Sequence, residues 1–216
     1  MISCKRSIRL LAFLILAAAG LSLVSGCGDD DAVTNPDPED PPKVTIQIVA
    51  IIASVSDGSN LLGGNIEVGN NITGTYTYDP AAVDENASAT VGQYMHDSPP
   101  YGIFLDINGY EFKTDLSDVN FLVGLSDNHG TPPKDHYQLI SYNNAEVLLN
   151  VSVGSISWQL DDPNAVKLTS TELTTEPPVL VGWTSDFGLT ITGSHTTDSM
   201  RTYSIRAHVT EIAKVE

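Results

Sequence analysis

Cysteine is scarce in this chain. Only Cys4 and Cys27 occur among 216 residues, so at most one intramolecular disulfide can form. A small domain stapled by several disulfides is therefore excluded, and so is a zinc site built from pairs of cysteines. A folded domain of this chain has to be held together by its hydrophobic core.

Basic residues are the second shortage. Ten Lys and Arg stand against 27 Asp and Glu, and the formal net charge is −17. Nucleic acid is not expected as a partner, because phosphate contacts need Lys and Arg. Anionic lipid head groups are unfavourable partners for the same reason. The excess of acid keeps a protein soluble and can also attract cations.

The chain begins with a short basic segment followed by the apolar run 10–24. A membrane-spanning helix needs about 20 predominantly apolar residues, and this run is shorter. A basic start, a short apolar run and small residues before Cys27 are typical of a secretory signal peptide. We expect residues 1–26 to be cleaved, and a permanent signal anchor is the alternative.

The segment Val24-Ser25-Gly26-Cys27 resembles the lipobox of bacterial lipoproteins, in which an aliphatic residue and two small residues precede a cysteine. The resemblance implies that Cys27 becomes the first residue and carries a diacylglyceryl group and a further acyl chain such as palmitate. Two or more chains hold a protein firmly on a bilayer. Gly28 stands where the family's inner-membrane retention signal has Asp. This departure implies a lipid anchor in the outer membrane, facing the periplasm or the cell surface.

Cleavage after residue 26 would leave 190 residues, with 27 acids, seven bases and a net charge of −20. Residues 28–43 contain six acids and four prolines and almost nothing apolar. Such a segment cannot bury enough apolar surface to fold. Proline stiffness and charge repulsion extend it by roughly 3 Å per residue. We therefore expect residues 27–43 to be a lipidated Cys27 followed by a tether of up to about 50 Å.

Residues 44–216 have the pattern of an all-β domain. Apolar residues alternate with polar ones in about ten short segments, separated by turns rich in Gly, Pro, Asn and Asp. No stretch shows a sustained helical period, although residues 170–176 could hold one helical turn before two prolines. We predict a single antiparallel β-sandwich, jelly-roll-like, of about ten strands.

Residues 103–114 carry the most specific local prediction. Asn108-Gly109 lies between two β-rich runs and is typical of a two-residue hairpin turn. On one apolar face this turn pairs Ile107 with Tyr110, Leu105 with Phe112, and Ile103 with Thr114. Other strands are expected at 72–78, 90–94, 121–125, 136–142, 147–153, 156–160, 187–191 and 203–209, and a bulge at Ile51-Ile52 in the strand that starts at Val44.

Three phrases of the body carry a second resemblance. They are ITGTYTYDP at residues 72–80, VGQY at 91–94 and SISWQLDD at 155–162. In this order they resemble exported bacterial β-rich proteins often found with a PEP-CTERM sorting tail, over most of residues 45–212. The resemblance implies an exported β domain of unknown function and brings no catalytic residues. Residues 210–216 lack the sorting tail of that family.

A search for chemistry yields no catalytic residue and no assigned cofactor. None of the five histidines, His96, His129, His136, His195 and His208, stands at the short spacing of a zinc motif, although His129 and His136 flank one loop. Structural calcium is the better metal hypothesis, because it takes oxygen ligands from loops. Its candidates are Asp115, Asp118, Asp127 and Asn128, or Asp79, Asp84, Glu85 and Asn86. Asp and Asn also favour turns for backbone reasons alone.

These observations favour a non-catalytic binding or surface-structural protein, anchored to the membrane by its lipid and with a glycan or an envelope protein as ligand. One alternative is a carbohydrate-active enzyme with carboxylates among Asp106, Glu111, Asp115 and Asp118. A calcium-stabilised envelope component is the other. Trp158 is expected in the core. Trp183, Tyr94 and Tyr101 lie near proline-containing loops, where they either contact a ligand or pack against the sandwich.

Overall fold

The computed structural model describes residues 43–183 and 188–215, which form one compact β domain. The predicted signal peptide, Cys27 and nearly all of the predicted tether lie outside these residues. Within the described ranges every regular element is a β-strand. None of these residues forms a helix that is long and apolar enough to cross a membrane.

The ten strands follow the expected alternation of buried and exposed side chains. They are β1 (Val44–Ser56), β2 (Asn71–Tyr78), β3 (Val91–His96), β4 (Gly102–Ile107), β5 (Tyr110–Lys113), β6 (Phe121–His129), β7 (Lys134–Ser141), β8 (Val151–Asp162), β9 (Leu189–His195) and β10 (Asp198–Lys214).

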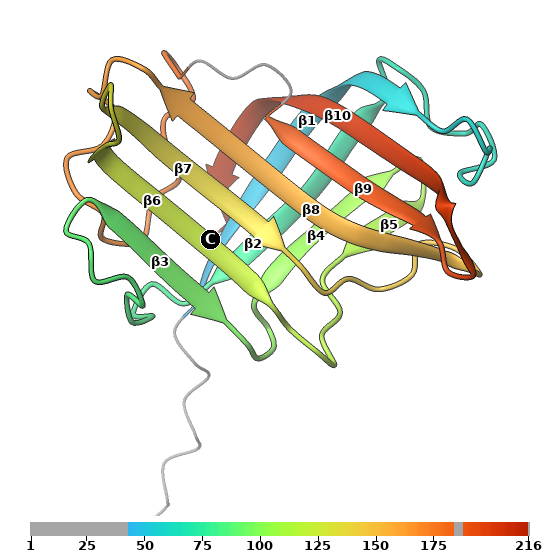
Figure 1. Cartoon of the computed structure of the whole chain (residues 1–216), viewed down its shortest axis with the longest axis horizontal. Coiled ribbons are helices and arrows are strands. Elements are labelled where there is room, and N and C mark those ends of the chain that lie inside the picture. Colours follow the sequence, from blue (N-terminus) through green and yellow to red (C-terminus); the bar gives the residue numbers. More distant parts are fainter. Residues whose placement is uncertain (1–42, 184–187, 216) are drawn as a thin grey trace, which may run out of the picture. The chain divides into compact units, whose positions relative to one another are not determined.

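All ten strands belong to one antiparallel sheet with the order β3-β6-β7-β8-β9-β10-β1-β2-β4-β5. Figure 1 shows β6, β7 and β8 crossing in front of β1, β2 and β4, so the sheet turns over onto itself through β9 and β10. The predicted all-β sandwich of about ten strands is therefore confirmed. The structure adds that both layers of the sandwich are parts of one continuous sheet.

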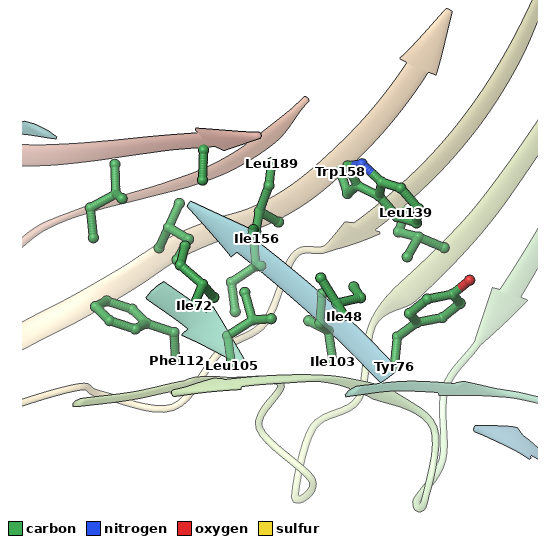
Figure 2. Close-up of a cluster of buried hydrophobic side chains, with 14 of the residues drawn as sticks. Ile48, Ile72, Tyr76, Ile103, Leu105, Phe112, Leu139, Ile156, Trp158 and Leu189 are labelled. Atoms are coloured by element: carbon green, nitrogen blue, oxygen red, sulfur yellow. The ribbon is translucent and has the colours of Figure 1, made fainter. Parts of the chain in front are cut away.

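The core lies between the two layers of this sheet. Figure 2 shows Ile48, Tyr76 and Leu105 on one layer pointing toward Leu139 and Trp158 on the other. The ring centroids of Tyr76 and Trp158 are 6.2 Å apart, and the hydroxyl oxygens of Tyr76 and Tyr137 share a hydrogen bond of 3.0 Å. These contacts join residues far apart in the sequence and hold the two layers together.

The predicted hairpin is confirmed in its register. Ile107 pairs with Tyr110 and Leu105 with Phe112, and Asn108 has a φ of 53° as a two-residue hairpin turn requires. The predicted interruption at Ile51-Ile52 is misplaced. The alternation of β1 continues through this pair, with Ile51 exposed and Ile52 buried. Pairing with β10 instead shifts after Val49 and again between Ile52 and Ser54.

One strand boundary is predicted wrongly. Residues 147–153 and 156–160 were expected to form two strands, but one strand, β8, runs without a break from Val151 to Asp162. The preceding residues form a turn in which the amide of Val151 donates to the carbonyl of Leu148. A run of apolar residues there suggested a strand, although Leu149 is 87% exposed. No helical turn forms at residues 170–176.

The two outer edges of the sheet are partly covered by the chain itself. Beside β3, the amide of Glu85 donates to the carbonyl of Gln93, and the amide of Gln93 donates to the carboxylate of Asp84. Beside β5, the amide of Ala145 donates to the carbonyl of Lys113. Uncovered edges recruit further strands and lead to aggregation. These contacts limit the pairing of the two edges with strands of other molecules.

Gly74 on β2 marks a place where two backbones meet closely. A Cβ atom at this position would lie 2.0 Å from the carbonyl oxygen of Phe104 on β4. We expect Gly74→Ala to lower the free energy of unfolding by about 2–3 kcal/mol, because the sheet must shift to admit the methyl group. Urea denaturation measures this change.

The matched control is Gly58→Ala, since a Cβ atom there meets nothing within 4 Å. This variant should change the free energy of unfolding by no more than about 1 kcal/mol. Equal stability of the two variants would contradict the close approach of β2 and β4.

His96, the last residue of β3, is 4% exposed and connects two parts of the sandwich. Its Nε2 accepts a hydrogen bond of 3.0 Å from the amide of Asp79, directly after β2. The neutral ring therefore carries its proton on Nδ1, which has no hydrogen-bond partner among the described residues. Burial lowers the pKa of His96, and protonation of Nε2 would remove the acceptor that Asp79 uses.

This arrangement predicts a pH dependence of stability. In the unfolded chain His96 takes up a proton near pH 6.5, whereas the folded protein does so only at lower pH. Between these values the unfolded state binds more protons, so the free energy of unfolding falls as the pH drops below about 6.5. Urea denaturation of the wild type between pH 8 and pH 5 should show this decrease.

The control variant is His96→Gln, which cannot take up the proton. Its stability should depend less on pH over the same range, because the other four histidines are present in both proteins. Parallel pH profiles of the two proteins would contradict a buried neutral His96.

Candidate functional site

One side of the sandwich is covered by the connection between β8 and β9. We call residues 163–183 of this connection the strap. It follows the end of β8 and is part of the orange segment at the left of Figure 1. The strap has no helix and no strand, so its position depends on contacts with the sandwich rather than on a regular backbone.

The first part of the strap is held by a buried carboxylate. Asp135 on β7 is 0% exposed, and its Oδ2 accepts hydrogen bonds from the amides of Lys167 and Leu168 at 2.6 and 2.8 Å. Its Oδ1 accepts a third bond, of 2.9 Å, from the amide of Asn128 near the end of β6, beside the turn to β7. A buried carboxylate is tolerated when such donors surround it. Asp135 therefore binds the strap and the neighbouring turn to the core.

The turn that leads into the strap is stabilised by a second acid. Asp162 at the end of β8 accepts hydrogen bonds from the amides of Val166 and Asn164 at 2.9 and 3.0 Å. The bond from Val166 lowers the pKa of the Asp162 carboxyl. The side chain of Asp162 therefore fixes the geometry of the turn that follows β8.

Two tyrosine hydroxyls hold the middle of the strap. Tyr78 Oη donates to the carbonyl of Thr174 at 2.5 Å, and Tyr94 Oη donates to the carbonyl of Thr171 at 2.7 Å. Burial, with a smaller contribution from Glu176, raises the pKa of Tyr78 to about 12. The Tyr78 hydroxyl therefore remains protonated and a donor at physiological pH.

A pocket of about 450 Å³ lies between the strap and the sandwich. Its floor contains Tyr137, Leu125 and Tyr78, which are 7%, 5% and 2% exposed. The strap supplies the remaining walls, which include Lys167, Leu168, Thr169, Ser170, Glu172, Leu173, Thr174, Glu176, Pro177 and Pro178. Clefts of this size, apolar with a few polar groups, are typical of small-molecule sites.

The charges at the pocket are partly compensated within the protein. Lys167 Nζ donates to the carbonyl of Val181 at 2.9 Å, and Lys214 Nζ pairs with Glu176 at 2.9 Å. Both ion-pair partners are well exposed, so this pair contributes little to stability. The pocket walls thus offer hydroxyl groups and carboxylates beside an apolar floor.

Three of the four aromatic residues considered for the core or for ligand contacts are buried. Trp158 is 0% exposed and lies in the core, as predicted. Tyr94 and Tyr101 are also buried, which contradicts a role as exposed contact residues. Trp183 is half-buried and packs against the core, so loop packing is the interpretation that the structure supports.

His129 and His136, the histidines that flank one loop, bind different groups of the protein. His129 Nδ1 bonds to the hydroxyl of Thr90 at 3.0 Å, whereas His136 Nδ1 bonds to the carboxylate of Asp161 at 2.7 Å. Gln159 donates to the other oxygen of Asp161 at 2.9 Å. His136 and Asp161 lie side by side on neighbouring strands, on the outward face of the sheet.

The acids proposed for a carbohydrate-active enzyme each bind a different group of the protein. Asp106 and Glu111 face each other across the β4–β5 hairpin, as the predicted register requires. Glu111 pairs with Lys113 at 2.6 Å, and Asp106 accepts a bond from Gly109 at 3.3 Å. Asp118 accepts a bond from the side-chain amide of Asn143.

The residues of the first predicted calcium site cannot all bind the same ion. Asp115 and Asp118 precede β6, whereas Asp127 and Asn128 lie at its other end, and a strand of nine residues spans about 30 Å. Asp115 accepts hydrogen bonds from the hydroxyl and the amide of Ser117, which lower its pKa.

In the second calcium set, Asp84 accepts amide bonds from Asn86 and Gln93, and Asp79 accepts one from Ala81. Within the described residues no three His, Cys, Asp or Glu side chains are placed to hold a metal ion. Structural calcium stays a prediction.

Asp135 was not among the residues predicted from the sequence, although it accepts three amide hydrogen bonds at this site. A signal was present, because Asp135 occupies an inward position in the alternation with Tyr137, Leu139 and Ser141 on β7. An acid at an inward strand position requires several hydrogen-bond donors in the fold. The sequence does not reveal that those donors are amides of the strap.

We expect Asp135→Asn to lower the free energy of unfolding by about 2–4 kcal/mol, because an amide side chain cannot accept all three amide hydrogen bonds in the interior. The strap should also become more sensitive to proteolysis. Urea denaturation and limited proteolysis measure these effects. Asp84→Asn is the control, since Asp84 also accepts two amide bonds but is exposed. Equal decreases in the free energy of unfolding of both variants would contradict the role of the buried Asp135 in holding the strap.

Comparisons of the chain with protein-family models, with curated proteins and with solved structures found no match. The two family resemblances therefore stay predictions.

Proposed function

We propose that this chain is an exported, lipid-anchored protein of the bacterial cell envelope with a non-catalytic binding role, and that the strap pocket is its ligand site. The anchoring part of the proposal is supported by the segment Val24-Ser25-Gly26-Cys27 after a basic and apolar start. The outer membrane is the proposed location, since Gly28 follows Cys27.

The observation that carries the binding role is the preformed pocket of about 450 Å³ beneath the strap. The strap is held at its start by Asp135 and in its middle by Tyr78. A binding protein with walls fixed in this way does not have to order a loop when the ligand enters, so less binding energy is lost.

The lining favours a small neutral molecule that combines an apolar face with hydroxyl groups, which is the chemistry of a sugar ring. The apolar floor is formed by Leu125 and the tyrosines. Hydroxyls of Thr169 and Ser170 and the carboxylate of Glu172 line the walls and can exchange hydrogen bonds with sugar hydroxyls. Anionic ligands are disfavoured by the formal net charge of −17.

Thermal unfolding in the presence of mono- and disaccharides and soluble envelope glycans tests this proposal. A ligand bound only by the folded state at 100 times its Kd adds about 2.7 kcal/mol to the free energy of unfolding. For a domain of this size this corresponds to a midpoint increase of roughly 5–10 °C. We expect at least one sugar to raise the midpoint in this way.

Two variants locate the effect. Ser170→Trp fills the pocket from an exposed strap position and should abolish the increase without unfolding the domain. Ser199→Trp places the same side chain on the exposed start of β10 and should leave the increase intact. An increase that survives Ser170→Trp, or no increase with any sugar, would contradict the proposal.

A further inference from the structure

The outer surface of the strap carries the apolar side chains that the sandwich does not use. Val166, Val179 and Val181 are 70%, 76% and 80% exposed. Lys167, next to Val166, donates its Nζ hydrogen bond to the carbonyl of Val181, so Val166 and the segment with Val179 and Val181 lie within the reach of one lysine side chain. We call these three residues the valine patch. Singly exposed apolar residues are ordinary, but three on one loop mark an interaction surface.

The segment that carries Val179 and Val181 is free of charged residues. Residues 177–183 read PPVLVGW and contain no charged residue, although the chain has 27 acids. Leu180 and Trp183 turn inward and pack against the core, whereas Val179 and Val181 on either side of Leu180 face outward. A segment with exposed valines and a neighbouring lysine, Lys167, suits the interface of a bilayer.

The position of the patch relative to the start of the domain identifies the partner. The strap is bound to the beginning of β1 through two contacts. Glu176, three residues before Val179, pairs with Lys214, and Lys214 lies opposite Ile46 in the sheet. Tyr78, which holds Thr174, lies opposite Val44. The chain therefore enters the domain beside the strap.

We infer that the valine patch docks on the surface of the bilayer that holds the lipid anchor. This inference rests on the proposed anchoring at Cys27. Only 16 residues separate Cys27 from Val44, so the anchor keeps the strap side within about 50 Å of the bilayer and at a high effective concentration. Weak apolar contacts of three valines are then sufficient to orient the domain, with its tether side toward the lipid.

Site-specific fluorescence of the processed full-length chain in phosphatidylcholine vesicles tests the orientation. Cys27 is the only cysteine after loss of residues 1–26, and lipidation blocks its thiol, so a single new cysteine can be labelled. Val181→Cys with an environment-sensitive dye should show a blue-shifted emission and quenching by brominated lipid. Met200→Cys is the control, since Met200 is 92% exposed and lies near the opposite end of β10.

The two labels and the flotation of the vesicles distinguish docking of the valine patch from anchoring at Cys27. A shift at position 181 that is absent at position 200 supports docking of the valine patch. If the chain floats with the vesicles and neither label shifts, or if both labels shift equally, the docking inference is overturned while the anchor stands. If the chain does not float with the vesicles, the proposed anchoring is wrong and the docking inference falls with it.

Discussion

The ten-stranded sheet has an apolar inner face, and another part of the same sheet has to cover that face. The described part of the chain has no helix that could lie on the apolar face, and its only regular elements are the ten strands. The sheet therefore turns through β9 and β10 and places β6, β7 and β8 against β1, β2 and β4. Burial of apolar area, at about 25 cal/mol per Å², provides the driving force.

Folding one sheet over itself leaves open sides between its two layers, and loops have to close these sides. On one side the strap closes the opening, and its side chains Leu168, Leu173, Leu180 and Trp183 pack against the core. Hydrogen bonds to Asp135, Tyr78 and Tyr94 also hold its backbone at separate points. The pocket lies between the strap and the sandwich, where these contacts leave space above Tyr137 and Leu125.

The parts of the fold governed by local chemistry could be predicted from the sequence. The Asn108-Gly109 turn and the two-residue period of β2 and β4 determined the faces and the register of these strands. The start of β8 was predicted wrongly, because most residues from Val147 to Val153 are apolar. Asn150 interrupts this run: its φ is 64°, and its carbonyl accepts a hydrogen bond from the amide of Thr196 between β9 and β10. The pocket could not be predicted. It requires Asp135 and residues 167–168 to meet, and only the turn after β8 brings them together.

The binding role and the docking face both depend on a strap that is held in place. Amide hydrogen exchange tests this directly at Lys167 and Leu168, whose amides donate to the buried Asp135. A fixed strap predicts that both amides exchange as slowly as those of β7 and β8, through unfolding of the domain. Exchange of both amides at the rate of an exposed loop would contradict a preformed pocket.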